Sequence, residues 1–356
     1  MNSGAKTPDQ QQKPGNGDKP DTGTTNRPWL KWGLVAAAAA TLLLCASAGG
    51  LYYYGQTRYL EPGPATADQV FLLERGTGLN ATAARLEKDG LVSSSLVFRL
   101  ALRVQGAAGS LKAGEYLIPA QASMDEIAAI LAEGKSIQHK LTIAEGLTSW
   151  EVMRLVETDP VLVGDMPETP PEGALLPETY LFTRGTTRAD IVGRMMAAHD
   201  EVLDRLWQER ATDLPFDTKE EAVTLASIVE KETGIASERP RVAAVFVNRL
   251  RKGMRLQSDP TIIYGITKGQ GPLGRPIRRS EIDRKTAYNT YQIDGLPPAP
   301  IANPGEASLA AVLNPPETKE YYFVADGTGG HAFAETHAGH MRNVAKWRRI
   351  ERTRSR

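Results

Sequence analysis

The chain is 356 residues long, which leaves room for roughly two or three domains with a sizeable hydrophobic core. Its 42 Lys and Arg residues balance its 42 Asp and Glu residues, and this net charge of zero argues against a nucleic-acid partner. The single cysteine, Cys45, excludes an intramolecular disulfide and a zinc site built from cysteines.

The N-terminus combines a polar tail with an apolar run. Residues 1–31 are rich in Gly, Pro, Gln, Asp and Lys without an apolar period, which predicts a disordered cytoplasmic tail. Residues 33–54 carry no charge and are long enough to cross about 30 Å of hydrocarbon, so we expect a transmembrane helix over 32–54. Trp32 at one end and Tyr52 to Tyr54 at the other suit an aromatic belt.

The competing interpretation of this run is a cleaved signal peptide, because Ala46-Ser47-Ala48 is typical of a cleavage site. We favour the uncleaved anchor, since apolar residues continue past Ala48. Arg27 and Lys31 precede the span, which favours an N-terminus inside the cell. Both interpretations place the bulk of the chain outside the cytoplasm.

After the apolar run, Pro62, Gly63 and Pro64 indicate a short linker over 55–66. Residues 67–135 then alternate between strand and helix patterns and predict a compact β-α-α-β unit followed by one more helix. We expect its strands at 70–73 and 115–118, and its helices at 80–88, 94–104 and 124–131.

The remainder of the chain predicts an α+β fold that is mainly helical with short strands. Proline-rich loops at 296–304 and 315–316 are expected to wall a cleft. The stretch beyond Gly253 is expected to be mostly loops. The other predicted elements are a strand at 141–143, helices at 150–156, 188–207 and 219–233, an edge strand or extended segment at 175–182, a helix capped by Ser237, a last strand at 321–325 and a basic C-terminal helix.

The segment LASIVEKETG, residues 225–234, places a carboxylate at the end of an apolar helix. At about 100° per residue, Glu232 lies on the same stripe as Leu225, Ile228 and Val229. Glu230 points roughly 140° away, towards the polar side of the helix. A carboxyl in apolar surroundings keeps its proton to higher pH, which suits a general acid. The alternative is a surface helix with solvated charges.

Three short motifs follow one another along the chain: Glu232-Thr233-Gly234, then 253–257 leading into Asp259-Pro260-Thr261, then Ala287-Tyr288-Asn289. This order resembles the lysozyme-like lytic transglycosylases, whose signature is Glu-Ser at a helix end, Gly-Leu-Met-Gln, and Ala-Tyr-Asn. The third motif matches letter for letter, whereas the first has Thr for Ser and the second matches loosely.

A closer resemblance is to the membrane-anchored endolytic murein transglycosylase family, also called YceG-like, and it extends from the apolar run to about residue 345. The segments that carry it are LKAGEY at 111–116, EGALLPETY at 172–180, ASIVEKET at 226–233, ASERPRVAAVFVNRLRKGMRLQSDPTIIYG at 236–265, GLPPAPIANPG at 295–305 and YYFVADGTGGHAF at 321–333. The resemblance implies a LysM-like module at 67–135 and a lysozyme-like catalytic domain at 136–350. The essential glutamate of the family corresponds to Glu232.

The chemistry implied by the resemblance is cleavage of the bond between N-acetylmuramic acid (MurNAc) and N-acetylglucosamine (GlcNAc) without water. One glutamate protonates the glycosidic oxygen and then takes the proton of the MurNAc 6-hydroxyl, which closes a 1,6-anhydro ring. Most glycosidases need two carboxylates. Here the substrate N-acetyl group can supply internal stabilisation, so Glu232 alone suffices as acid and base, and neither a cofactor nor a metal is expected.

Substrate-binding candidates come from the same motifs. Gln257 and Asn289 can donate hydrogen bonds to N-acetyl or hydroxyl groups, and Tyr288 and Tyr291 can pack against sugar faces. For each of them a purely structural role is the alternative. Glu178 is a candidate second carboxylate of the cleft, although we favour a surface acid on an extended strand.

Two other classes of function compete with the enzyme. A non-catalytic glycan-binding scaffold of the wall-synthesis machinery would need only the anchor and the LysM-like unit. A metal-dependent hydrolase would use His331, His337 and His340, but the chain has no HExxH-type motif. We expect an inner-membrane, single-pass enzyme with its catalytic domain in the periplasm, acting on peptidoglycan strands beside peptidoglycan synthases.

Overall fold

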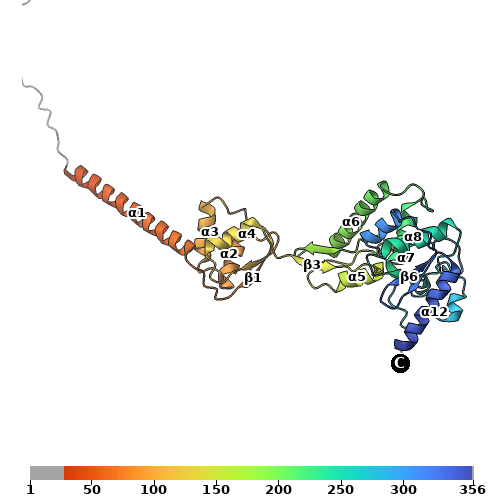
Figure 1. Ribbon diagram of the computed structural model, residues 1–356. Coiled ribbons are helices and arrows are strands. Elements are labelled where there is room, and N and C mark those ends of the chain that lie inside the picture. Colours follow the sequence, from red (N-terminus) through yellow and green to blue (C-terminus); the bar gives the residue numbers. More distant parts are fainter. Residues whose placement is uncertain (1–27, 355–356) are drawn as a thin grey trace, which may run out of the picture.

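The computed structural model describes residues 28–354, with side chains from Trp32 onwards. A long helix leads into an N-terminal module, a two-stranded ribbon follows, and a larger C-terminal region ends the chain (Figure 1). Helices alternate with three separate antiparallel strand pairs, so the molecule mixes helix and strand as the α+β prediction expected. Within the described residues, three hydrophobic cores follow one another along the chain.

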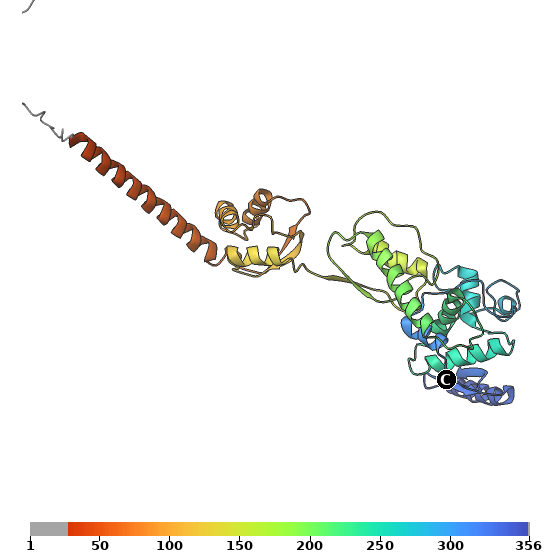
Figure 2. The same ribbon diagram turned by 90° about the horizontal axis from the view of Figure 1, so that it is seen from above.

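The first helix, α1 (Pro28–Leu60), stands clear of the rest of the molecule over most of its length (Figure 2). Within residues 28–354 it is the one helix long and apolar enough to cross a membrane, over Trp32–Leu60. It does not end at Tyr54, because the first proline after the apolar run is Pro62. The predicted linker is therefore wrong for residues 55–60, which are helical.

The N-terminal module follows directly and has the predicted order of elements. Tyr59, in the last turn of α1, is only 2% exposed and belongs to the module's core together with Phe71, Phe98 and Tyr116. In the strand pair, Phe71 lies opposite Tyr116. The module contains β1 (Gln69–Leu73), α2 (Leu79–Lys88), α3 (Ser95–Val104), β2 (Gly114–Ile118) and α4 (Met124–Glu133).

The second core lies beneath an antiparallel ribbon. It contains β3 (His139–Thr142), α5 (Ser149–Thr158), β4 (Thr179–Phe182) and α6 (Arg188–Gln208). The strand expected over 175–182 is regular only at its C-terminal half. Leu175 and Leu176 are instead buried in an extended segment, where the Leu176 amide donates to the Met195 carbonyl at 3.2 Å. Pro177, which follows, has no amide hydrogen for a strand ladder.

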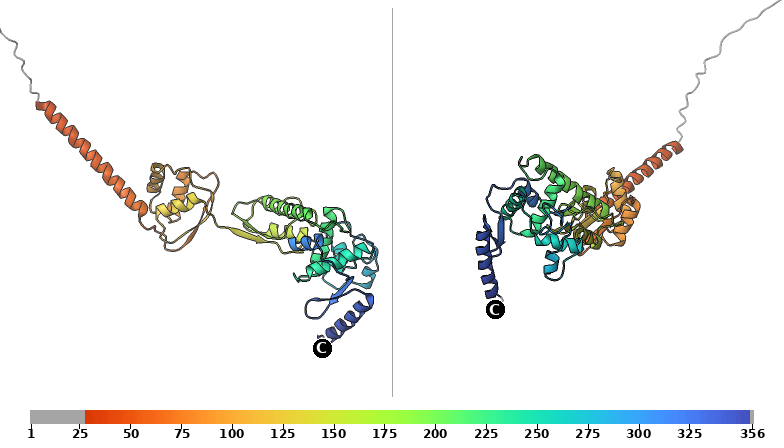
Figure 3. Two further views of the ribbon diagram at one scale, coloured as in Figure 1. Left: turned by 45° about the horizontal axis from the view of Figure 1, so that its top comes forward. Right: turned by 90° about the vertical axis from the view of Figure 1, so that its right-hand side faces the viewer.

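The third core is helical, and Figure 3 shows its elements at the far end of the molecule from α1. Helices α7 (Lys219–Glu232), α8 (Arg239–Arg251) and α11 (Glu306–Leu313) pack together at its centre. Its other elements are α9 (Asp259–Thr267), α10 (Arg279–Ile282), β5 (Tyr322–Ala325), β6 (His331–Ala334) and α12 (His337–Arg354).

Two predictions for this third core are wrong, whereas the stretch after Gly253 is rich in loops as expected. That stretch also contains the central helix α11, which was not predicted because it is apolar around most of its circumference and shows little helical period. The strand predicted to be the last is followed by β6. Ser237 is exposed and does not cap α8, which begins after Glu238; the Glu238 carboxylate bonds His331 instead.

Candidate active site

Glu232 is the last residue of α7, and the apolar stripe behind it is buried as the helical wheel predicted. Leu225, Ile228 and Val229 are all 0% exposed. The Ser258 hydroxyl donates to the Glu232 Oε1 at 2.5 Å. Burial raises the pKa of Glu232, and this hydrogen bond opposes the rise without cancelling it. The carboxyl is therefore biased towards its protonated form.

Three neighbouring ionisable side chains also affect the pKa of this carboxyl. The negative charge of Asp259 raises the pKa of Glu232 further, while His331 and Arg249 lower it. Asp259 follows Ser258 at the start of α9, and its Oδ1 accepts a hydrogen bond from the Tyr291 hydroxyl at 2.8 Å. Burial, reinforced by Asp259, raises the pKa of Tyr291, so this phenol stays a donor. Glu232 thus lies among donors and charges from four separate segments.

A tight turn at Gln257 places Ser258 within hydrogen-bond distance of the Glu232 carboxyl. Gln257 has a left-handed φ of 54°, which is costly for a residue with a side chain. Backbone pairing to Thr290 holds the turn: the Gln257 amide donates to the Thr290 carbonyl at 3.1 Å, and the Ser258 amide donates to the Thr290 hydroxyl at 2.9 Å. The second and third sequence motifs therefore meet at this point.

Buried Arg249 supports the same turn from α8. Its guanidinium donates to the carbonyls of Leu256 at 2.5 Å and Tyr321 at 2.7 Å. Burial lowers the pKa of Arg249, because the charge sits among carbonyls with little water. The segment before Ser258 is thereby tied to the segment before β5.

Asn289 does not reach a cleft. It is 1% exposed, and its Nδ2 donates to the carbonyls of Glu281, Ile282 and Arg284 at 3.1, 3.0 and 2.6 Å. Its Oδ1 accepts from the Tyr291 amide at 3.0 Å. All of its hydrogen-bonding capacity is used inside the protein, so Asn289 positions Tyr291 rather than binding a sugar.

The other predicted substrate contacts divide into two groups. Gln257 is exposed in the turn directly before Ser258. Tyr291 is close to the same segment, because its hydroxyl donates to Asp259. Tyr288 is half-buried with its ring 5.0 Å from that of Tyr264. Glu178 is exposed on the ribbon, where its charge bears on Tyr180 in the second core. It is not brought to Glu232.

A carboxylate that the sequence analysis passed over lies behind Tyr288. Glu172, in the EGALLPETY segment, accepts a hydrogen bond from the Ser149 amide at 2.7 Å and one from the Tyr264 hydroxyl. Burial raises its pKa. The nearby cavity of about 360 Å³ is lined by Glu151, Lys231, Pro260, Ile263, Tyr264, Thr267, Gly271, Pro272, Leu273 and Ile301.

The helical-wheel prediction that Glu230 lies on the polar side of α7 is wrong. Glu230 does not face solvent, because its side chain is 5% exposed and lies 3.5 Å from the guanidinium of Arg239. Its Oε2 accepts from the Gly305 amide at 3.0 Å and from the Ser308 hydroxyl at 2.7 Å, which caps the start of α11. The packing of α11 on α7 buries the side that an isolated helix would leave polar.

The histidines of the C-terminal segment are held by other groups. The Glu238 carboxylate bonds the ring Nδ1 of His331 at 2.8 Å and accepts from its amide at 3.0 Å. His337 and His340 both contact the ring of Tyr322, at 5.9 and 5.2 Å between centroids. Across residues 28–354 no three His, Cys, Asp or Glu side chains are grouped to hold a metal ion.

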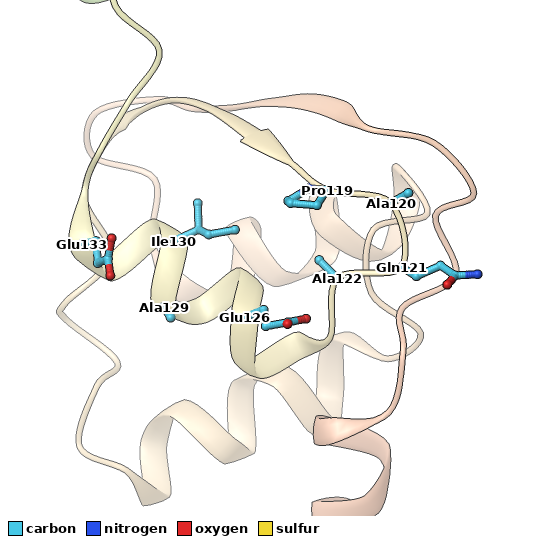
Figure 4. Close-up of a pocket in the computed structure, with 8 residues that line it drawn as sticks. All are labelled: Pro119, Ala120, Gln121, Ala122, Glu126, Ala129, Ile130 and Glu133. Atoms are coloured by element: carbon cyan, nitrogen blue, oxygen red, sulfur yellow. The ribbon is translucent and has the colours of Figure 1, made fainter.

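A larger cavity, of about 420 Å³, belongs to the N-terminal module (Figure 4). It lies between α4 and the turn after β2, and its polar members are Gln121, Glu126 and Glu133. Glu126 is already used to cap α4, and Glu133 pairs with Lys135 at 3.1 Å. No aromatic residue lines this cavity, and hydrogen bonds from Ser123 lower the pKa of Glu126, which is the opposite of the shift at Glu232.

A model of the YceG-like family matches residues 71–346, which is well over half of the chain. The chain belongs to the YceG-like family. The endolytic murein transglycosylase of Bacillus subtilis is 27% identical over 304 residues, covering 76% of this chain and 82% of that protein.

Two further relatives extend the comparison. The endolytic murein transglycosylase of Streptococcus pneumoniae is 29% identical over 323 residues and 77% of this chain. The chain spans only 57% of the length of that relative. A crystal structure of a YceG-like protein from Listeria monocytogenes covers 78% of this chain and 99% of its own, with 27% identity and a TM-score of 0.48.

Proposed function

We propose that this YceG-like protein is an endolytic peptidoglycan lytic transglycosylase with Glu232 as its single acid and base. The observation that carries the proposal is a partly buried carboxyl at a helix end, with a raised pKa and one hydroxyl donor, Ser258. Relatives named endolytic murein transglycosylase cover most of the chain and supply the substrate class. Glu232 was also predicted from the sequence, by its position on the apolar stripe of the helix.

The reaction takes one proton from Glu232 and restores it with a different proton from the substrate. Protonated Glu232 gives its proton to the glycosidic oxygen as the bond to the MurNAc C1 breaks, and GlcNAc leaves with a 4-hydroxyl. The resulting Glu232 carboxylate, held by the Ser258 hydroxyl at Oε1, then accepts the proton of the MurNAc 6-hydroxyl. The freed O6 bonds to C1, and the product strand ends in 1,6-anhydro-MurNAc.

The neighbouring side chains take supporting roles in this scheme. Gln257 and Tyr291 are proposed substrate contacts, since one is exposed beside Ser258 and the other keeps a phenolic hydroxyl beside Asp259. Tyr288 is proposed to pack against a sugar face. Asn289 and Arg249 hold the segments that carry these groups, and Glu178 has no role in the reaction.

The finer architecture belongs to the same proposal. The N-terminal module is proposed to be LysM-like, because its first four elements follow the order β-α-α-β. The region around α7 is proposed to be lysozyme-like, on the motifs that meet at Ser258. α1 is proposed to anchor the protein in the inner membrane, with the tail in the cytoplasm and the remainder in the periplasm.

The proposal is tested by mass spectrometry of purified glycan strands after incubation with the full-length protein in detergent and with its Glu232→Gln variant. The expected result is internal fragments ending in 1,6-anhydro-MurNAc, which the variant does not release. Reducing-end products would assign a hydrolase instead. Glycan binding without cleavage by either form would assign a scaffold.

A further inference from the structure

The most exposed apolar stripe outside α1 lies on α3. Leu96, Leu100 and Val104 follow one another at i, i+4 and i+8, and they are 56%, 50% and 77% exposed. The opposite side of the helix, with Phe98 and Leu102, fills the core of the N-terminal module. α3 therefore has two apolar sides, and the module covers only one of them. A soluble helix of this kind normally turns a polar face outwards.

The end of α1 holds α3 close to the membrane. α1 packs against both α3 and α4, and the Tyr59 hydroxyl lies 3.5 Å from the side-chain oxygen of Gln105, the residue directly after α3. Figure 1 and the left view of Figure 3 both place α3 on the side of the module from which α1 enters. The C-terminal end of the exposed stripe thus adjoins the point where the span meets the module.

The segment between the apolar span and the N-terminal module is too short to leave a gap between the module and the membrane surface. Tyr54 closes the aromatic belt of the span, and Tyr59 is already in the module's core. At about 1.5 Å per helical residue, these two residues are about 7.5 Å apart along the axis. The headgroup layer on one side of a bilayer is about 5 to 8 Å thick. The module must therefore begin where the headgroups end.

The charges of α3 suit a lipid surface. The helix contains Arg99 and Arg103 and no acidic residue. Both guanidinium groups donate to the side-chain oxygen of Asn80, at 3.4 and 3.3 Å, and neither forms an ion pair within 4 Å among the described residues. Glu87 is the one carboxylate on which Arg99 acts: the hydrogen bonds from Ser95 lower the Glu87 pKa, and the charge of Arg99 adds to this effect. An apolar stripe flanked by arginines is the composition of helices that lie in the bilayer interface.

We propose that α3 docks on the membrane from outside, with Leu96, Leu100 and Val104 in the interface and the arginines at anionic headgroups. This proposal rests on the proposed anchor role of α1 but not on the proposed reaction. The helix and the span together would fix the tilt of the module, and with it the height above the membrane at which the ribbon and the catalytic region begin.

The test uses the full-length protein reconstituted in vesicles of phosphatidylethanolamine and phosphatidylglycerol. A bimane label is attached at Leu100→Cys in a Cys45→Ser background, and quenching by nitroxide-labelled lipid is compared with quenching by aqueous iodide. Leu117→Cys is the matched control, because Leu117 is 51% exposed and Leu100 is 50% exposed. Leu117 lies on β2, in the strand pair across the module.

The expected result is loss of fluorescence with nitroxide lipid at position 100 but not at position 117, and the reverse pattern with iodide. Equal iodide quenching at both positions would overturn the proposal. So would protection of position 100 from both quenchers, which would indicate a second copy or another protein on this face.

Two controls separate this proposal from the others. A label on the native Cys45 reports the span itself, and its failure to be quenched by lipid would overturn the anchor together with the docking. A Glu232→Gln form carrying the same labels should give unchanged quenching, whatever the outcome of the cleavage assay. A Leu96→Ser change should reduce lipid quenching at position 100. The same change, made in a separate protein that keeps Leu100 and is labelled at the native Cys45, should leave the quenching of that label unaltered.

Discussion

The two sides of the end of α7 hold two glutamates in opposite conditions. On the side that faces α11, Glu230 accepts hydrogen bonds from Gly305 and Ser308 and lies beside Arg239. On the side that faces α9, Glu232 receives one hydroxyl, from Ser258, and has the negative Asp259 nearby. Both side chains are largely shielded from water, but only one is supplied with the partners that an ionised carboxylate needs.

The difference shows how a single helix can carry a structural acid and a reactive one. Burial raises the pKa of a carboxyl, whereas hydrogen-bond donors stabilise its ionised form and lower the pKa again. Glu230 accepts hydrogen bonds from Gly305 and Ser308 and lies beside Arg239, and in this position it caps α11. Glu232 is left short of donors, and this deficit keeps it poised to give up a proton to a substrate.

The largest expected effect comes from removing the Glu230 side chain, and it is a loss of stability. Glu230→Ala leaves Arg239, whose side chain is 8% exposed, without one of its two carboxylates and uncaps α11, so unfolding should become easier by about 3 kcal/mol. Urea titration measures this change. Glu157→Ala, at an exposed pair with Arg154, is the control and should change stability by less than about 0.5 kcal/mol. Equal effects would mean that Glu230 is not structural.

A smaller loss of stability is expected from a change at Asn289, which holds the segment beside the turn that carries Ser258. Asn289→Ala removes three hydrogen bonds to carbonyls, so we expect a loss of about 2 kcal/mol in unfolding free energy and reduced cleavage. Thermal or urea unfolding measures the first and product yield the second. Unchanged stability with a raised KM would instead make Asn289 a sugar-binding residue.

The reactive side can be tuned in both directions by its neighbours. The protonated form of Glu232 starts the reaction, so activity should fall as pH rises through its pKa. Asp259→Asn removes a charge that raises this pKa, so the alkaline limb should move to lower pH. Ser258→Ala removes a hydrogen bond that lowers it, so the limb should move to higher pH. Shifts in the same direction would contradict this account of the site.

The smallest expected effect lies at a third acid, where the module meets the ribbon. Burial raises the pKa of Glu115, but hydrogen bonds from His139 at 2.6 Å and Arg184 at 2.9 Å outweigh it, and the net pKa is lowered. Its stabilising contribution is therefore present above its ordinary pKa and lost as pH falls through the lowered one. Glu115→Gln should remove about 1 kcal/mol of local stability.

Hydrogen exchange at the Ile137 amide, which donates to the Glu115 carbonyl at 2.6 Å, measures this joint. Exchange should become about five-fold faster in the variant at neutral pH and approach the wild-type rate in acid. A difference that persists in acid would show that charge is not the cause.

Local signals predicted much of the fold. In the N-terminal module each strand and helix is short, bounded by turns and capped by its own residues, such as Ser94 for α3 and the Ser123 and Glu126 capping box for α4. These signals lie within a few residues of the element they define, so the sequence alone reveals them. The same holds for α7 and its buried stripe.

What the sequence did not reveal depends on contacts between distant segments. α11 is apolar all round, so only its burial against α7 and α8 identifies it as a central helix. The same contact turned the apparently solvated Glu230 into a buried cap. Asn289 matches a motif letter for letter, yet its role is set by carbonyls that a loop brings to it. Ser258 lay within the second motif but showed its importance only beside Glu232.

The most direct test of this account is to compare Glu232→Gln with Glu230→Gln in one assay of 1,6-anhydro-MurNAc formation, at equal concentrations of folded protein. The account predicts that Glu232→Gln loses at least about 10³-fold in rate, while folded Glu230→Gln stays within about ten-fold of the wild type. Near-equal losses in the two variants, or residual cleavage by Glu232→Gln at the wild-type rate, would contradict it.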